Sequence, residues 1–331
     1  MKMARIYGIL ILLLLLLFGL SLLHGSVDIP WGQTLDVLTG STAQRESWRF
    51  IILESRLPQA LTALLAGGAL SVSGLLLQTA FRNPLAAPDI FGVTSGASLA
   101  VALLTLTPVM AFAGAWAYVS SVAAAFVGAM AVTVVIWLLS RVVRSNVVLI
   151  IIGIMIGYLT SSGITLLNFF ATEEGVKSFA VWGMGNFGNV SMAQMPFFAA
   201  VTLVATASTL LLMKPLNALL MGERYAASLG IDVRRTRNIL LALTGLLTAV
   251  VTAFCGPIAF IALAVPHVAR LLLRTSNHRQ LLPVTILTGS AVALLCNVLT
   301  TLPGSGGMLP LNAVTPLIGA PVIIYVILKR Q

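Results

Sequence analysis

The sequence predicts an all-α membrane protein, a single domain over residues 1–331 with about ten transmembrane helices. Only 8% of its 331 residues are charged, whereas about a quarter are charged in a soluble domain. The mean hydropathy is +1.04, and apolar stretches of about 20 residues, each long enough to cross a bilayer as a helix, recur along the chain. The stretches are continuous rather than alternating, which favours helices over a β-barrel, because lipid offers no partner to free backbone groups.

The first stretch, "ILILLLLLLFGLSLL", follows Lys2 and Arg5 and has the outline of a secretory signal peptide. No clear A-x-A cleavage site follows it and many further spans do, so we interpret it as a retained first helix. The ten predicted spans are 6–23, 57–81, 91–108, 116–140, 146–170, 193–213, 237–255, 257–274, 281–302 and 310–328. An even number of spans places both termini on the same side of the membrane.

The distribution of charge indicates which side that is. Fifteen of the 19 Lys and Arg residues fall on the side of the termini, and the other side has only Arg45, Arg49, Arg56 and Lys177. Cytoplasmic loops carry the excess of Lys and Arg, so both termini are expected in the cytoplasm. The net charge of +10 is therefore attributed to topology rather than to nucleic-acid binding.

Two connections between spans are long. Residues 24–56 lie on the outer side and end in "ESWRFIILESRLP", which mixes charged and apolar residues as a surface helix does. Residues 214–236 lie on the inner side. Their helix-forming residues, interrupted by glycines, predict two short helices that lie against the membrane face.

An internal repeat is also indicated. The segments "GLLLQTAFRNPLAAPDIFGV" and "GLLTAVVTAFCGPIAFIALAV" share a helix of small residues, a break that contains proline, and a second apolar run. Pro84 in the first break is predicted to be cytoplasmic and Pro257 in the second to be external. Matching pieces on opposite faces are typical of the inverted repeats of transporters.

The sequence lacks the common catalytic and metal-binding motifs. It has no G-x-x-x-x-G-K-[ST] phosphate loop, no H-E-x-x-H and no CxxC, so we expect no ATP hydrolysis, no metal and no bound cofactor in this chain. Cys255 and Cys296 lie in apolar runs and are interpreted as small buried residues. Ion-driven transporters place charged residues at mid-membrane, but the nearest candidate here, Asp89, lies in a cytoplasmic break. The histidines near span ends are interpreted as interfacial or packing residues: His24, His267 and His278.

Small residues recur at helical spacing on two spans. Gly153, Gly157 and Ser161 fall every fourth residue on the fifth span, and Gly67 and Ser71 do so on the second. Such stripes allow helices to approach closely, either inside one subunit or at a dimer seam, or they form a surface that faces a pathway.

Four blocks of the sequence resemble the FecCD/BtuC-type permeases, the membrane subunits of ABC importers for ferric siderophores, haem and cobalamin. The blocks follow the family order and are "RLPQALTALLAGGALSVSGLLLQTAFRNPLAAPDIFGVTSGASLA" at 56–100, "GERYAASLGI" at 222–231, "CGPIAFIALAVPHVARLLL" at 255–273 and "LPLNAVTPLIGAPVIIYVI" at 309–327.

The resemblance implies a BtuC-like (type II ABC importer) fold in the bacterial cytoplasmic (inner) membrane, with two permease subunits, expected as a homodimer, around a central pathway. A cytoplasmic ABC ATPase subunit that uses ATP and Mg would drive transport, and a periplasmic or surface-anchored substrate-binding protein would deliver the cargo. The expected cargo is an iron chelate, a ferric siderophore first, with haem second and cobalamin third. The chain itself would not be an enzyme.

The resemblance also gives a role to the break "RNPLAAPDIFGV". Asn83 and Leu85 resemble the residues that narrow the inner mouth of the pathway and so form a cytoplasmic gate. Pro84 and Pro88 would keep the segment irregular, because proline removes a backbone donor and disfavours helix for the residue before it. The alternative is a plain turn with Arg82 anchored at the lipid headgroups.

Residues 214–236 resemble the cytoplasmic coupling helices that fit a groove on the ATPase. The residues that match are Gly222, Glu223, Ala226, Leu229 and Gly230. Glycines permit the tight break and the close approach. The alternative is an amphipathic helix on the membrane surface.

On the outer face, Arg56 resembles a residue that pairs with glutamates of the binding protein, a charge match that fixes orientation. Arg45 and Arg49 are further candidates, although headgroup contact explains them equally well. The chain departs from the family at two positions: Gln59 replaces a frequent second Arg, and Asn312 replaces a usual Gly. The effect of Asn312 depends on whether its backbone needs a positive φ, which Asn tolerates better than most residues.

Two other functions remain as alternatives. An ion-gradient-driven secondary transporter would need buried carboxylates or cation-binding carbonyl groups. A membrane enzyme or scaffold would keep the spans without needing the coupling segment.

Overall fold

The computed structural model describes residues 2–329 apart from 41–43, 108–114, 144 and 303–306, and every regular element in this described part is helical. The N-terminal half contains α1 (Lys2–Leu23), α2 (Trp31–Leu38), α3 (Glu46–Phe50), the π-helix η1 (Ile51–Arg56), α4 (Leu57–Ala80), α5 (Val93–Thr105), α6 (Ala115–Val142) and α7 (Asn146–Phe170). The C-terminal half contains α8 (Glu173–Gly183), the 3₁₀-helix η3 (Phe187–Asn189), α9 (Met195–Leu210), α10 (Met213–Met221), α11 (Glu223–Ser228), α12 (Val233–Cys255), α13 (Ile261–Leu273), α14 (His278–Thr300) and α15 (Leu311–Lys329). The all-α fold class is thereby confirmed.

Each of the ten predicted spans coincides with a helix, but the helices differ in length. Within the described residues, six helical stretches are long and apolar enough to cross a membrane, and a seventh is added if the bent pair of α9 and α10, with an angle of 52°, counts as one span. The apolar helices α5, α13 and α15 are shorter. At 13 residues, α5 and α13 rise by about 20 Å each, less than the roughly 30 Å of a bilayer core. The segments 81–92 and 256–260 before them are irregular.

The structure supports the internal repeat. In both units a long helix, α4 or α12, is followed by an irregular break and a 13-residue helix, α5 or α13. Each long helix packs most extensively on the third helix of the other unit: α4 on α14, and α12 on α6. This exchange of partners between the two units is consistent with an inverted repeat.

Glycines allow the central helices to cross at backbone contact. A Cβ on Gly67 of α4 would lie 2.3 Å from the carbonyl oxygen of Gly289 of α14, and the reverse distance, from Gly289 to Gly67, is 2.4 Å. Gly96 and Gly128 make the same reciprocal contact between α5 and α6, at 2.5 and 2.3 Å. Larger side chains would separate these helices, so the small residues of the sequence determine the packing.

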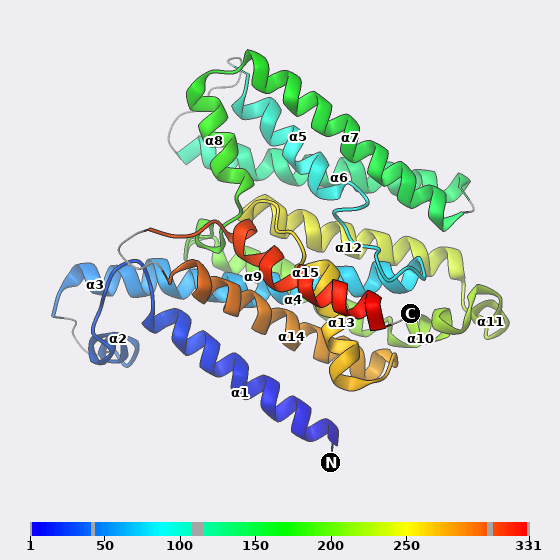
Figure 1. Ribbon diagram of the computed structural model, residues 1–331, viewed down its shortest axis with the longest axis horizontal. Helices are drawn as coiled ribbons and strands as arrows, with labels where there is room; N and C mark the ends of the chain where they lie inside the picture. Colours follow the sequence, from blue (N-terminus) through cyan, green and yellow to red (C-terminus); the bar gives the residue numbers. More distant parts are fainter. Residues whose placement is uncertain (1, 41–43, 108–114, 144, 303–306, 330–331) are drawn as a thin grey trace.

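The helices form two parts (Figure 1). The α5–α8 layer contains α5, α6, α7 and α8, and the main body contains the other spans. The two parts meet where α12 of the main body packs on α6 and α5. Helices α2 and α3 lie at one end of the molecule, the α3 end, whereas α10, α11 and both termini lie toward the other, the α11 end (Figure 1).

Two local predictions need correction. The surface helix expected before residue 57 is not separate: Glu46–Ala80 forms one continuous helical stretch through η1. Helix α8 was not expected, although Thr172 accepts a hydrogen bond from the backbone of Gly175 at its start and two glutamates occupy its first turn. A capping threonine followed by acidic residues is a usual helix start, but the short segment lacks the long apolar run that identified the spans.

Candidate functional site

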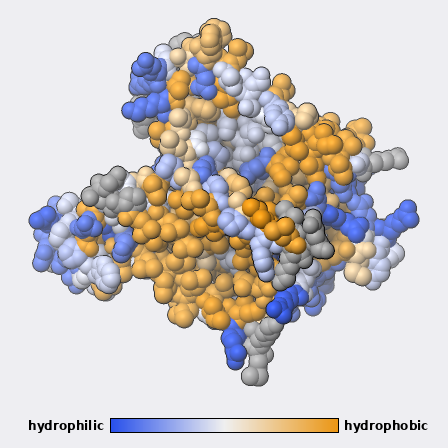
Figure 2. Space-filling model, viewed as in Figure 1, coloured by the Kyte–Doolittle hydropathy of each residue, from blue (hydrophilic) through white to orange (hydrophobic). Residues whose placement is uncertain are grey.

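A cleft lies between the α5–α8 layer and the main body. Figure 2 shows it as a recess with pale and light-blue side chains beside the orange apolar surface. At the α3 end it holds a cavity of about 430 Å³, which α5, α6 and α8 line on one side and the ends of α12, α14 and α15 on the other. Its polar lining consists of hydroxyl and amide groups: Thr105, Tyr118, Ser121, Ser178, Asn186, Asn189, Asn297 and Thr300. No described residue of this lining carries a formal charge.

The break between α4 and α5 lies toward the α11 end. Arg82, the second residue after α4, has a φ of 48°, which turns the chain away from the helix axis. The side-chain oxygen of Asn83 accepts a hydrogen bond of 2.9 Å from the backbone of Leu85, an Asx-type turn. Leu85 is 42% exposed, and Asn83 and Pro84 are partly exposed. The predicted gate residues therefore share one short, partly solvent-facing turn.

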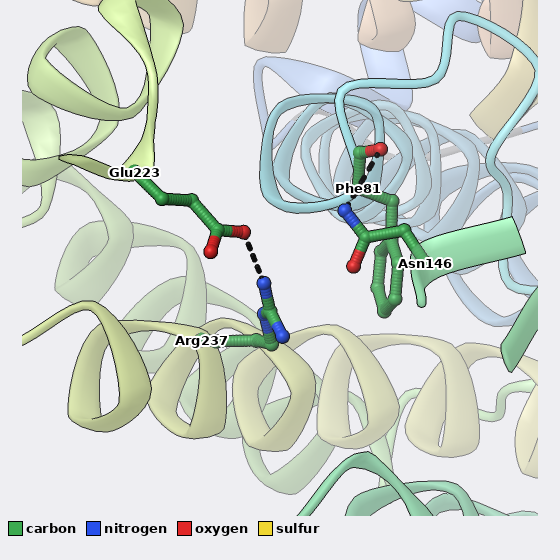
Figure 3. A network of polar contacts seen from close by, with 4 residues as sticks. All are labelled: Phe81, Asn146, Glu223 and Arg237. Atoms are coloured by element: carbon green, nitrogen blue, oxygen red, sulfur yellow. Dashed lines mark hydrogen bonds and ion pairs between the residues drawn. The ribbon is translucent and has the colours of Figure 1, made fainter. Parts of the chain in front are cut away.

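Contacts with two helices, and one contact within the break itself, hold this break in place. The ring Nε2 of His267 in α13 lies 2.8 Å from the carbonyl oxygen of Pro84. Asn146 at the start of α7 donates to the carbonyl oxygen of Phe81 at 3.5 Å (Figure 3). The rings of Phe81 and Phe91 lie 4.5 Å apart across the base of the break. The break is thus tied to both parts of the molecule.

The small residues of α7 have different environments. A Cβ on Gly153 would lie 2.6 Å from the carbonyl oxygen of Ile90 and 2.7 Å from the Cα of Phe91, so α7 touches the backbone of the break at this point. A Cβ on Gly157 would have only Ser95 Oγ nearby, at 3.7 Å. Ser161 is exposed. Close packing inside the subunit explains Gly153, whereas Gly157 and Ser161 remain candidates for a pathway or a second subunit.

The coupling segment forms two short helices, α10 and α11, as the sequence indicated, and the predicted coupling residues lie on α11 and beside its two ends. Gly222 has a φ of 116° and Gly230 a φ of 79°, values that favour glycine at both ends of α11. Ala226 is fully buried, and Leu229 is 58% exposed. Glu223 forms an ion pair with Arg237 of α12 (Figure 3).

A buried histidine links these helices to the break, which the sequence did not reveal. Asn217 of α10 accepts a 2.7 Å hydrogen bond from the backbone of His278, and its Oδ1 also lies 3.0 Å from the ring Nδ1. The ring Nε2 lies 3.0 Å from the hydroxyl of Thr79, near the end of α4. A neutral ring that donates from Nδ1 and accepts at Nε2 satisfies both neighbours. His278 is completely buried, so it connects α10 directly to the helix that leads into the break.

The only carboxyl group in the break is that of Asp89. Burial raises its pKa from the ordinary value to about 6, and a hydrogen bond with Thr94 acts in the opposite direction. Asp89 is partly buried, so its charge state responds to how tightly the break is packed.

The predicted docking arginines are placed differently from one another. Arg45 lies over the ring of Trp48, 5.0 Å from its centroid, and Arg49 is exposed at the end of α3. Arg56 is only 4% exposed, and its guanidinium donates to the carbonyl oxygens of Leu22 and Leu23 at the end of α1 and of Val27 in the segment that follows. In this conformation Arg56 caps α1 and does not reach the surface, because three carbonyl groups already occupy it.

The two departures from the family pattern also have structural explanations. Gln59 is buried and donates to Asn297 at 2.8 Å, so position 59 faces the interior. Among the described residues other than glycine, positive φ values occur only at Arg82, Phe260 and Arg274. Asn312 therefore has ordinary backbone geometry, and its side chain forms hydrogen bonds described below.

The described residues offer no metal site: no three His, Cys, Asp or Glu side chains lie close enough together to hold an ion. Cys255 and Cys296 are buried as free thiols, as interpreted from their apolar surroundings. The absence of a bound cofactor remains a prediction.

Known proteins are similar to this chain over nearly its whole length. The family model of the FecCD transport family matches residues 12–329. The ferric enterobactin transport system permease protein FepD of Escherichia coli is 36% identical, with 97% of this chain and 94% of FepD covered. The vitamin B12 import system permease protein BtuC of Klebsiella pneumoniae is 33% identical, with coverage of 98% and 94%.

Two further similarities extend this comparison. The hemin transport system permease protein HmuU of Yersinia pestis is 32% identical, with 88% of this chain and 87% of HmuU covered. A solved structure described as an inward-facing conformation of a metal-chelate type ABC transporter matches with a TM-score of 0.84 and 30% identity, over 98% of this chain and 99% of the other.

Proposed function

The chain belongs to the FecCD transport family, and from this we propose that it is the transmembrane permease subunit of an ATP-driven ABC importer that moves an iron chelate across the cytoplasmic membrane. The observation that carries the proposal is the connection between α10 and the break. Asn217, His278 and Thr79 form a continuous set of contacts from a surface helix to the end of α4, which leads into the break. Such a connection suits a protein whose pathway is opened by a partner that pushes on α10 and α11.

The partners follow from this role. A cytoplasmic ABC ATPase, which uses ATP and Mg, would bind at the α11 end. A periplasmic or surface-anchored binding protein would bind at the α3 end, with Arg45 and Arg49 as contact residues. A second copy of the chain would complete the pathway along the exposed face of α7. Both termini would lie in the cytoplasm, because the α11 end carries most of the basic residues.

The cargo is proposed from the relatives. FepD, HmuU and BtuC are named for ferric enterobactin, hemin and vitamin B12. We place a ferric siderophore first, haem second and cobalamin third. An uncharged polar cleft is compatible with a large chelate that must not bind tightly on its way through.

A secondary transporter remains the alternative function. Its coupling ion would need a carboxylate or a cage of carbonyl groups in the membrane. Within the described helices that span the membrane, the longest apolar windows contain at most two charged residues each, and Asp89 lies in the break outside them. The proposed energy source is therefore a partner rather than an ion gradient.

The role of α11 can be tested with the ABC ATPase proposed as the partner of this chain. Leu229 is 58% exposed on α11, and Leu302, at the α3 end, is 59% exposed. We expect Leu229→Asp to weaken the affinity of the permease for the ATPase at least tenfold, because a charge would enter an apolar contact, and Leu302→Asp to leave it unchanged. Equal affinities for the two variants in a pull-down titration would contradict the assignment of α11 as the ATPase contact.

A further inference from the structure

The α5–α8 layer meets the main body a second time at the α3 end. The backbone of Asn312, at the start of α15, donates a 3.0 Å hydrogen bond to the carbonyl oxygen of Met184, just after α8. The backbone of Asn186 donates at 2.8 Å to the carbonyl oxygen of Cys255, at the end of α12. These contacts join α8 to two helices of the main body.

The side chain of Asn312 adds three hydrogen bonds at the same place. Its amide nitrogen donates to the carbonyl oxygens of Gly183, at 3.0 Å, and Pro257, at 2.7 Å. Its amide oxygen accepts from the backbone of Ala259 at 3.1 Å. Both donor hydrogens and the acceptor are used, so only a carboxamide of this length satisfies all three backbone groups.

The chains touch backbone to backbone around this side chain. Gly185 has a φ of 70°, and a Cβ there would lie 2.9 Å from the carbonyl oxygen of Pro257. Gly256 has a φ of 74°, and a Cβ there would lie 2.5 Å from the carbonyl oxygen of Trp182. The contact leaves no room for a side chain between α8 and the loop 256–260, so the cleft is closed at this point.

The contact between α8 and the main body lies beside the cavity of the cleft. Met184, Gly185, Asn186 and Leu311 line the cavity at the α3 end. Helix α8 otherwise packs mainly on α5, inside its own layer. Separation of the α5–α8 layer from the main body at this end would therefore break the hydrogen bonds from Asn312 to Gly183 and Met184.

We propose that Asn312 holds the cleft closed at the α3 end and is a positioning residue that must release α8 before cargo can enter from that side. The inference rests on the proposed function, since an importer that receives cargo at the α3 end has to open there. The carboxamide favours the closed conformation, which is the one this structure adopts. Removal of the side chain shifts the protein toward the conformation that is open at the α3 end.

The test measures the width of the cleft directly. Spin labels are attached at Lys177→Cys on α8 and Leu302→Cys beyond α14, both exposed positions on opposite sides of the cleft. The labelled chain is reconstituted in lipid nanodiscs with excess unlabelled chain, so that pulsed electron resonance reports the distance within one chain. The native cysteines are completely buried, and a chain with only these two thiols serves as the labelling control.

Three substitutions separate the side chain from the helix start. Asn312→Gly removes all three side-chain hydrogen bonds. Asn312→Asp keeps the shape and the acceptor but replaces the donor by an oxygen that faces the carbonyl groups of Gly183 and Pro257. Ala313→Gly loosens the same helical turn at an exposed neighbour without touching the contact.

We expect the ratio of long to short distances to rise several-fold in both Asn312 variants, as the loss of one net hydrogen bond between α15 and α8 allows, and Ala313→Gly to keep the wild-type distribution. Unchanged distances in Asn312→Gly and Asn312→Asp would overturn the proposal. A change of the same size in Ala313→Gly would also overturn it, because the effect would then belong to the helix start. The measurement needs no cargo, ATP or partner, so its result is independent of whether transport is observed.

Discussion

The contact between Gly153 of α7 and the break allows a quantitative prediction. A methyl group at position 153 would lie 2.6 Å from the carbonyl oxygen of Ile90, whereas ordinary contacts begin near 3.4 Å. Either α7 or the break must move by about 0.8 Å, and the neighbouring atoms are backbone atoms that cannot rotate away. Overpacking of this kind costs about 1–3 kcal/mol.

Gly157 supplies the matched control, one turn further along the same helix. Its nearest neighbour, Ser95 Oγ, would lie 3.7 Å from an added Cβ, so Gly157→Ala introduces no clash. Both Gly153→Ala and Gly157→Ala gain the helix preference of alanine over glycine, about 0.5–1 kcal/mol. The difference between the two variants therefore isolates the overpacking, with Gly153→Ala less stable by about 1–3 kcal/mol.

The assay is thermal unfolding of the two purified variants in the same detergent, followed by ATP-driven uptake. For a chain of 331 residues the difference corresponds to roughly 1–4 °C in Tm. We also expect slower uptake by Gly153→Ala, since the displaced backbone belongs to the break that holds Asn83 and Leu85. Equal Tm values and equal uptake for Gly153→Ala and Gly157→Ala would refute the close contact between α7 and the break.

Three further predictions concern charges and one glycine. Arg56→Ala should lower the stability of the chain by about 2–4 kcal/mol, because buried carbonyl groups at the end of α1 lose charged donors. Arg49→Ala should leave Tm unchanged but slow association with the binding protein in a salt-dependent way. The opposite pattern would assign Arg56 to the docking surface. The pKa of Asp89 is raised to about 6, so the folded state holds a proton that the unfolded state releases between pH 4 and 6, and stability falls as the pH rises through this range. Asp89→Asn should therefore be more stable than the wild type by about 1–2 kcal/mol at pH 7.5, after allowance for the partial exposure of Asp89, and equally stable near pH 4. Tm values measured across this pH range test this, and a stability difference that stays constant with pH would contradict the burial of the carboxylate. Gly230→Ala forces a φ of 79° on alanine, although no neighbour lies within 4 Å of the new methyl group. We therefore expect several-fold weaker ATPase binding in a titration, with a nearly unchanged Tm. Full binding would show that this turn is not part of the ATPase contact.

The sequence identified the parts of the fold whose signals are local. The apolar runs located the helices, the prolines and the Asn-Pro step located the break after α4, and glycines at both ends predicted the short helices α10 and α11. The environment of Gly153 and the link through His278 could not be predicted, because they join positions far apart in the chain. Thr79 and His278 are separated by 199 positions, and no periodicity in either segment indicates their contact.

Arg56 shows a second limit of sequence-based prediction. An arginine at a predicted membrane boundary is ordinarily exposed, since a buried charge needs partners. Here the partners are carbonyl groups at the end of α1, which are available because the last carbonyl groups of any helix lack partners within it. Only the crossing of α1 near η1 brings them to the guanidinium group, and that crossing is a property of the whole bundle.

The most direct test of the account is uptake into proteoliposomes that contain this chain and the two partners proposed for it, an ABC ATPase and a substrate-binding protein. Labelled ferric siderophore, haem and cobalamin would be offered in parallel, with and without ATP, and with an imposed proton or sodium gradient. We predict accumulation of one cargo, the ferric siderophore, that requires ATP and is insensitive to the gradient. Uptake driven by the gradient in the absence of ATP would contradict the central claim and identify the chain as a secondary transporter.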